Sequence, residues 1–217
     1  MLKVVKPTEN FRGMSYGDWA IEWNKWLMSR DPDNYDGSDM LYLRSNIEYD
    51  PHGFTPGKPM EMDPNVYYET SREIDTHTAI FIPLLTSTYS IGEICNGEKL
   101  NTERDMRRVA SEELYEPHQI WALVNGSKIV PDLSDYLFET PLFELEVTGV
   151  LNYDRPLEKG VYKTISKGYF ILLGSLEVGR YDINFGTFSN VGETYYTKSI
   201  YHINVTTSKF KMIDNPL

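Results

Sequence analysis

The stretch Ala79-Ile80-Phe81-Ile82-Pro83-Leu84-Leu85 is an almost continuous apolar run. A short run without polar alternation is typical of a strand that is buried on both faces, as in the core of a sandwich. Pro83 cannot donate a hydrogen bond to a sheet ladder, so it indicates a bulge or a strand end within the run. The run therefore predicts a central strand with an irregularity at Pro83.

Segments with strand character lie on both sides of this run and are separated by turn signals. Residues 142–147 alternate acidic with apolar side chains, and Asn125-Gly126 is a strong hairpin signal. Strands at intervals of ~8–12 residues with turns between them are typical of a sandwich or barrel. We therefore predict a mainly β fold, an antiparallel β-sandwich of jelly-roll-like type, with strands at 40–44, 66–69, 78–85, 118–124, 128–130, 142–147, 161–165, 169–173, 181–185 and 195–205.

Two helices are predicted beside these strands. Ser15 and Asp18 have the spacing of a capping box, which satisfies the free amides at a helix start, and they predict a helix over 15–30. Thr102 and Asp105 repeat this spacing and predict a helix over 102–115. One stripe of the second helix carries the residues expected to be buried: Met106, Val109, Ala110 and Leu114.

Three tryptophans of the first helix, Trp19, Trp23 and Trp26, fall on one helical stripe. If the stripe is exposed, it is a candidate platform for a ligand or a contact surface for a partner. More often such a stripe docks a helix onto a sheet, and we favour this interpretation.

An acid-rich turn follows the first helix and contains Asp31, Asp33 and Asp36, which are weak candidates for cation ligands. The order of a calcium loop is not met, because position 5 counted from Asp31 is Tyr35 and position 12 is Tyr42. A solvated turn is the better interpretation.

Residues 49–64 form a long segment rich in proline and glycine that has no regular period. Loops of this length inside a domain usually carry function or make contacts. Phe54 within the loop, and Tyr67 and Tyr68 just after it, are therefore candidate contact residues.

The composition argues against several classes of function and partner. The chain has 21 basic and 32 acidic residues, and its net charge of −11 repels nucleic acid and anionic membrane surfaces. Cys95 is the one cysteine, so no internal disulfide forms. Neither a leader nor the ~18 apolar residues of a membrane span is recognised, so we expect a protein made in the cytoplasm. No repeat or linker divides the chain, which predicts one domain over 1–217, with an arm and helix over 1–30 and the sandwich over 40–210.

A search for catalytic motifs identifies none. The four histidines, His52, His77, His118 and His202, lie outside metal-ligand spacing of one another and of Cys95. Motifs for nucleotide binding and for a serine nucleophile are also missing. Glu144 and Glu146 share a strand face, which is the usual solvent face of a half-exposed strand. We therefore expect no cofactor, no metal and no catalytic residue.

Several segments match a known pattern in order over residues 15–205. They begin with an S-Y-G-[DE]-W motif at the first helix. The matching residues are Ser15-Tyr16-Gly17-Asp18-Trp19 with Trp23 and Trp26, Ala79-Ile80-Phe81-Ile82-Pro83, Asn125-Gly126 with Leu133 and Tyr136, Thr140-Pro141-Leu142-Phe143, and Gly168-Tyr169-Phe170 with Leu173, Leu176, Gly179, Tyr181, Ile183 and Phe185. Together they resemble an uncharacterised β-sandwich family of bacteria and phages without an established activity. The resemblance implies a sandwich module of the kind that decorates phage particles, and it supplies no catalytic residue. Unlike the bacterial members, this chain is expected to have no leader, and their frequent paired cysteines are reduced to Cys95.

These observations lead to one principal hypothesis and two alternatives. The principal hypothesis is a non-enzymatic structural and interaction protein at the virion surface of a tailed phage, either a capsid decoration or an accessory subunit. Its expected partners are other protein subunits of a capsid or particle shell and further copies of itself, and its location is the virion after synthesis in the host cytoplasm. The first alternative is a carbohydrate-binding β-sandwich. The second is a hydrolase with an acidic, cation-assisted site.

Overall fold

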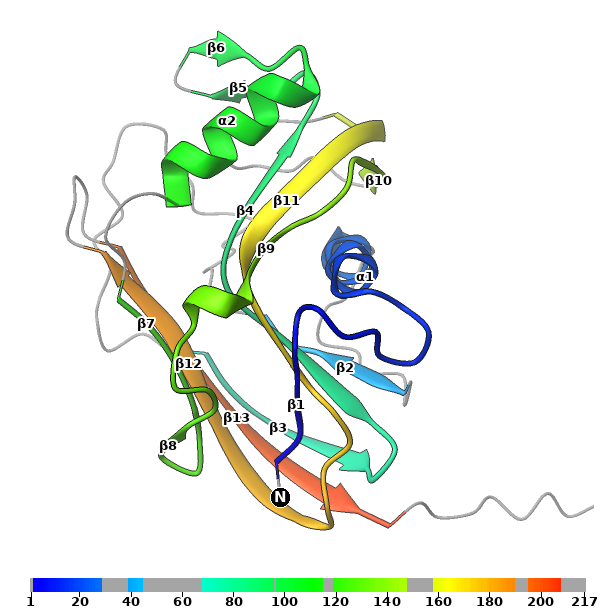
Figure 1. The fold of residues 1–217 in the computed structure, drawn as a ribbon, viewed down its shortest axis with the longest axis vertical. Helices are drawn as coiled ribbons and strands as arrows, with labels where there is room; N and C mark the ends of the chain where they lie inside the picture. Colours follow the sequence, from blue (N-terminus) through cyan, green and yellow to red (C-terminus); the bar gives the residue numbers. More distant parts are fainter. Residues whose placement is uncertain are drawn as a thin grey trace, which may run out of the picture.

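The computed structural model describes residues 2–28, 39–44, 68–95, 97–114, 119–147, 158–189 and 195–207. This part of the chain is mainly β, with two large sheets and two α-helices (Figure 1). The predictions of a mainly β fold, of an N-terminal helix and of one further helix are confirmed.

The first sheet is built around the two long strands β4 and β11. Its strands follow the order β1-β11-β4-β2. β9 and β10 also pair with β11, at positions nearer its N-terminal end. The bounds are β1 Val4–Val5, β2 Met40–Tyr42, β4 Ala79–Ser90, β9 Leu137–Glu139, β10 Phe143–Val147 and β11 Gly160–Leu173.

The second sheet has the strand order β3-β13-β12-β7-β8. A separate small hairpin, β5–β6, precedes the second helix. The bounds are β3 Tyr68–Asp75, β5 Ile94–Cys95, β6 Glu98–Lys99, β7 Gln119–Val124, β8 Ser127–Lys128, β12 Gly179–Ser189 and β13 Tyr195–Thr206.

Both large sheets are mixed, so an antiparallel sandwich is not confirmed. β2 runs parallel to β4, and β3 runs parallel to β13. Neighbours joined by a short hairpin must run antiparallel, whereas strands that are distant in sequence are free of that constraint. Turn signals in the sequence report only the hairpins, so the prediction missed the two parallel pairs.

A bulge interrupts β4 at the position that Pro83 predicted. Phe170 of β11 pairs with Pro83, whereas its neighbour Tyr169 pairs with Leu85. Leu84 is therefore the extra residue of the bulge. The extra residue lets β4 keep its pairing with β11 although Pro83 has no amide to donate.

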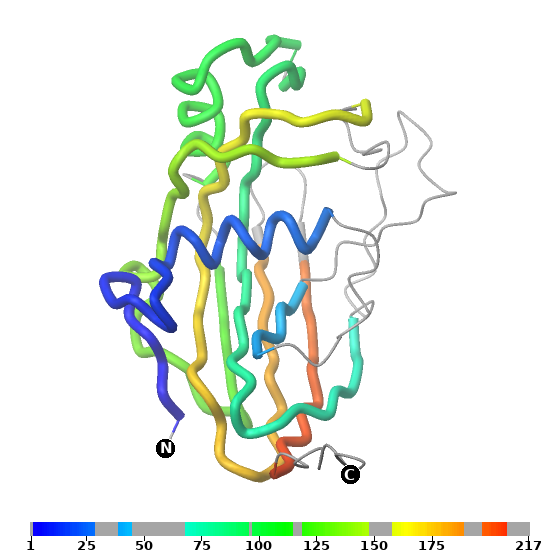
Figure 2. Tube along the Cα trace, turned by 90° about the vertical axis from the view of Figure 1, so that its right-hand side faces the viewer, coloured from blue at the N-terminus to red at the C-terminus, as the bar shows by residue number. Residues whose placement is uncertain are grey.

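The helix α1, Tyr16–Met28, crosses the strands of the first sheet (Figure 2). Its start is the predicted capping box, in which the Ser15 amide donates to Asp18 Oδ2 (2.8 Å) and the Asp18 amide donates to Ser15 Oγ (3.2 Å). The Ser15 hydroxyl also donates to Asp18 Oδ2 (2.7 Å), and this bond, together with the bond from the Ser15 amide, lowers the pKa of the Asp18 carboxyl. The Tyr16 hydroxyl accepts a bond from the Leu172 amide (2.8 Å) and donates to the Phe170 carbonyl (3.3 Å), which fixes the helix to β11.

The opposite face of the first sheet is shared by the second sheet and by α2, Glu103–Leu114 (Figure 1). The larger core cluster contains both Ile80 and Ile82 of β4 and Ile183 and Phe185 of β12. The smaller cluster lies under α2 and consists of Tyr89, Leu100, Met106, Val109, Ala110 and Ile165. Three residues of the predicted α2 stripe are buried, and the fourth, Leu114, is half-buried.

Candidate functional site

The face of the second sheet that points away from the first sheet is the candidate functional surface. Side chains alternate along a strand, so a buried residue identifies its neighbours as outward-pointing. Ala122 and Val124 of β7, Ile183 and Phe185 of β12, and Tyr201 and Ile203 of β13 are buried. The residues between them therefore form the outer face, which we define as Trp121 and Leu123 of β7, Arg180, Asp182, Asn184, Gly186 and Phe188 of β12, Lys198, Ile200, His202 and Asn204 of β13, and Glu69, Ser71 and Glu73 of β3.

The six-membered ring of Trp121 lies against Gly186 in the outer face. The two residues are register partners in the antiparallel pair β7–β12. A Cβ at Gly186 would lie 2.5 and 2.8 Å from two carbons of the Trp121 six-membered ring and would also collide with the Thr197 carbonyl. The indole Nε1 donates a bond to Asn184 Oδ1 (3.0 Å), two residues away on β12. The ring is thus fixed along β12, with its nitrogen at Asn184 and its benzene edge over the glycine.

A histidine flanked by two carboxylates lies elsewhere on the same outer face. His202 Nδ1 is 2.7 Å from Asp182 Oδ1, and His202 Nε2 is 2.8 Å from Glu69 Oε1. The bond to Glu69, which has the largest effect, and the bond to Asp182 raise the pKa of His202 above its ordinary value. The reason is that both ring nitrogens donate only when the imidazole is protonated. The three residues join β12, β13 and the parallel edge strand β3 across the outer face.

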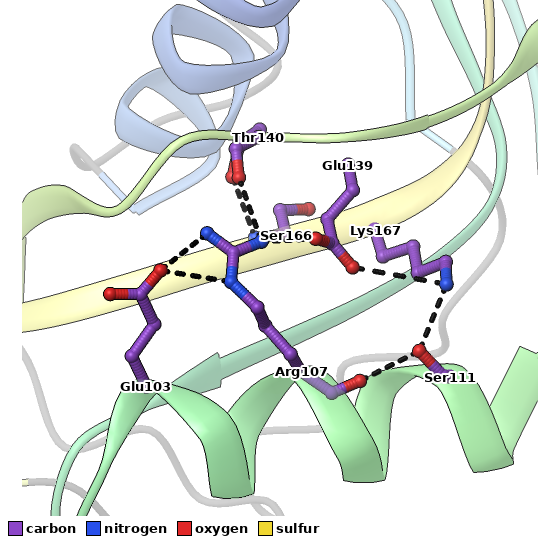
Figure 3. A network of polar contacts seen from close by, with 7 residues as sticks. All are labelled: Glu103, Arg107, Ser111, Glu139, Thr140, Ser166 and Lys167. Atoms are coloured by element: carbon purple, nitrogen blue, oxygen red, sulfur yellow. Dashed lines mark hydrogen bonds and ion pairs between the residues drawn. The ribbon is translucent and has the colours of Figure 1, made fainter.

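A second polar cluster fixes α2 to the first sheet (Figure 3). Arg107 bonds Glu103 within the helix through Nε and Nη2 (2.9 and 2.6 Å) and bridges to Glu139 of β9. Lys167 Nζ donates to Ser111 Oγ (2.9 Å) and lies 3.8 Å from Glu139 Oε2.

The Ser111–Lys167 pair in this cluster has the separation of a nucleophile and its base, but its bonds run the wrong way. Lys167 is the donor to Ser111, and the Ser111 hydroxyl donates its own hydrogen bond to the Arg107 carbonyl (2.7 Å). A general base would instead have to accept the hydrogen bond of the serine hydroxyl. The arrangement attaches α2 to β9 and β11.

The predicted tryptophan stripe lies mostly inside the protein. Trp19 and Trp23 are 8% and 4% exposed, and their indole nitrogens donate to the carbonyls of Phe11 (3.1 Å) and Leu43 (2.9 Å). Trp26 is half-buried and packs against Tyr42 at a centroid distance of 5.6 Å. The interpretation that this stripe docks the helix is confirmed for Trp19 and Trp23, whose rings therefore leave little surface for a ligand or a partner.

Tyr68 is the one candidate of the long-loop group that the structure describes. Its ring is half-buried, lies 5.5 Å from the ring of Tyr201, and carries the Arg44 guanidinium at 4.8 Å from its centroid. Phe54 and Tyr67, and the acid-rich candidates Asp31, Asp33 and Asp36, lie outside the described residues.

The remaining titratable candidates do not assemble into a metal site in the described ranges. Glu144 and Glu146 are exposed, as their alternation predicts, and Phe143, Leu145 and Val147 between and beside them are buried. Cys95 is half-buried, with Sγ 3.6 Å from the Tyr89 hydroxyl. Among the residues that can be placed, no group of three or more His, Cys, Asp or Glu is arranged to hold a metal ion.

Sequence reasoning missed the outer face. Trp121 falls within the predicted strand 118–124, and alternation against Ala122 and Val124 could have identified it as outward-pointing. Its position over Gly186 depends on the pairing of β7 with β12, and the contact of His202 with Glu69 depends on the parallel pairing of β3 with β13. Neither pairing has a local sequence signal.

Comparisons with known proteins identify no relative: no family model, no curated protein and no solved structure matches this chain. Within the described ranges, neither helix is long and apolar enough to cross a membrane.

Proposed function

We propose that this chain is a non-catalytic structural and interaction protein that binds other protein subunits through the outer face of its second sheet. The observation that carries the proposal is the composition of that face. It presents Trp121, Leu123, Phe188 and Ile200, all half-buried, next to charged side chains on the neighbouring strands β12, β13 and β3. An apolar centre with a charged periphery is typical of the part of a protein surface that binds another protein.

The polar clusters elsewhere support this proposal because they have internal roles. Arg107, Glu139 and Lys167 attach α2 to the first sheet. Asn24, fully buried in α1, accepts a bond from Thr88 of β4 (3.1 Å). Groups that hold elements together contribute rigidity, which a building block of a larger assembly needs.

The finer part of the proposal rests on the resemblance at the S-Y-G-D-W helix start. We propose a virion accessory or decoration subunit of a tailed phage, with a capsid or particle shell as partner and with copies of itself as neighbours. A jelly-roll-like relationship of the two facing sheets belongs to the same proposal.

Sedimentation of the native assembly, followed by mass spectrometry of co-migrating proteins, tests the proposal. We expect co-migration with the shell proteins of a large particle. Ile200→Asp places a charge within the apolar part of the outer face and should abolish it, whereas Glu144→Gln, on the exposed face of β10, should leave it intact. A free monomer or small oligomer in the native source contradicts the structural role. Co-migration that survives Ile200→Asp contradicts the choice of surface.

A further inference from the structure

We propose that His202 couples the docking of a partner subunit on the outer face to the uptake of a proton, so that docking is strong in mild acid and weak in mild alkali. This inference rests on the proposed subunit-binding role of the face and names its regulation. It is carried by the position of His202 between the carboxylates of Asp182 and Glu69, which lie 2.7 and 2.8 Å from its two ring nitrogens. We call these three residues the histidine clasp.

The histidine clasp borders the apolar part of the outer face. Ile200 and His202 occupy successive outward positions of β13. Glu69 of β3 is the register partner of Ile200, and Asp182 of β12 is the register partner of His202. A subunit that covers Ile200 therefore reaches the clasp as well, so the clasp loses part of its contact with water when the subunit docks.

The two protonation states of His202 differ in how the carboxylates are paired. The imidazolium ring has an N–H on each nitrogen, so it donates to Asp182 and Glu69 at the same time. The neutral ring has one N–H, so one of the two carboxylates then faces a bare ring nitrogen and receives no bond from the ring. Covering an unpaired carboxylate costs more free energy than covering one that is hydrogen-bonded to a cation. Docking therefore favours the protonated ring.

This preference makes docking depend on pH in a definite direction. The bond to Glu69, and then the bond to Asp182, raise the pKa of His202 in the free chain. Above that pKa each docking event must take up a proton, so the affinity falls by at most about tenfold for each pH unit. Below that pKa the ring is already protonated, and the affinity is independent of this group.

The charged neighbours of the clasp come from the same three strands. Among the described residues of the outer face they are Arg180 of β12, Lys198 of β13 and Glu73 of β3, and the uncharged Ser71 of β3 is the register partner of His202. Because these groups are unchanged in a His202 variant, a difference in pH dependence between that variant and the native chain belongs to His202.

The test compares attachment at about pH 6 and about pH 9, which bracket the range in which histidines titrate. Native assemblies are collected by sedimentation at the lower pH, transferred to the higher pH and sedimented again, and mass spectrometry measures this chain in the pellet and the supernatant. We expect retention at the lower pH and release at the higher pH, while the shell proteins stay in the pellet. Return to the lower pH should restore attachment.

Three variants separate the clasp from other effects of pH. His202→Gln should attach more weakly at the lower pH and change little at the higher pH. Glu69→Gln should stay attached at the higher pH, because its amide can donate to Nε2 of a neutral ring that keeps its Nδ1–H for Asp182. His77→Gln is the matched control, since His77 lies in the turn between β3 and β4, and it should follow the native chain. His52 and His118 lie outside the described residues and are present in every variant.

The outcomes distinguish failure of the clasp from failure of the subunit role, and circular dichroism melts establish that each variant is folded. Equal retention of the native chain at both pH values, or tighter attachment at the higher pH, overturns the inference and leaves the subunit role standing. An unchanged pH dependence in His202→Gln, or release of Glu69→Gln at the higher pH, does the same. Absence of co-migration at both pH values contradicts the subunit role and the inference together.

Discussion

Trp23 and Trp121 use the same chemistry in two different regions of the molecule. Each indole nitrogen donates one hydrogen bond, from Trp23 to the Leu43 carbonyl (2.9 Å) and from Trp121 to Asn184 Oδ1 (3.0 Å). The surroundings differ. Trp23 is 4% exposed and meets the ring of Phe170 edge-on at 6.0 Å, whereas Trp121 is half-buried over a glycine.

The difference shows how a residue type changes role with its support. Around Trp23, the rings of Phe81 and Phe170 stack at 5.5 Å and bury the aromatic surface between α1 and the first sheet. Under Trp121, Gly186 removes the side chain that would otherwise lift the indole from the strand. The first arrangement uses the ring for stability. The second keeps a ring of fixed orientation on the outer face of a sheet.

The largest loss of stability is expected from removal of the buried ring of Trp23. Trp23→Ala should destabilise the fold by about 3–5 kcal/mol, because a large aromatic leaves a cavity and the Leu43 carbonyl loses its donor. Trp121→Ala should cost roughly 1 kcal/mol, as is usual for substitutions outside the core. Denaturant unfolding followed by circular dichroism measures both free energies of unfolding. Equal losses would show that the outer ring is as much a part of the core as Trp23.

A smaller effect is expected from filling the space beneath Trp121. Gly186→Ala should destabilise by about 1–3 kcal/mol, because its Cβ would collide with the Thr197 carbonyl and displace the indole ring. Gly174→Ala is the matched control, since the nearest atoms to its Cβ, all of Lys3, lie 3.5–3.6 Å away at ordinary contact distance. It should change stability by less than ~0.5 kcal/mol. Thermal melts compare the stability of the two variants with that of the native chain. Equal stability of both variants would contradict the close contact of Trp121 and the Thr197 carbonyl with Gly186.

Local patterns in the sequence predicted the region around Trp23 well. Ser15 and Asp18 marked the start of α1, and the helical spacing of the tryptophans identified its buried stripe. The apolar run with Pro83 predicted a doubly buried strand with a bulge, which β4 is. In each case the signal and the structure lie within a few residues of one another.

The outer face could not be predicted in this way. It is assembled from β7, β12, β13 and β3. The parallel pairing of β3 with β13 brings Glu69 to His202, although the two residues are far apart in the sequence. Only the register of the sheet brings Trp121 over Gly186, and register follows from tertiary packing of the buried face. The individual strands were recognisable, but the neighbours of each strand were not.

The smallest expected effect concerns His202, which lies between Asp182 and Glu69 on the outer face. The pKa of His202 is raised by its bonds to Glu69 and Asp182, so its contribution to stability is full below about pH 6.5, the ordinary histidine value, and is lost as the pH rises through the raised value. The neutral ring keeps one N–H, so one of the two carboxylate bonds must break. His202→Gln should therefore be less stable than the native chain at pH 6, by about 0.2–1 kcal/mol for each solvent-exposed pair, and this deficit should shrink by pH 9.

Arg180, Lys198 and Glu73 face the same surface in both proteins, and the two chains share every ionisable group except His202, so the difference between the two unfolding curves isolates His202. Nuclear magnetic resonance titration of the imidazole gives the pKa directly, and a value at or below the ordinary one would contradict the doubly bonded geometry.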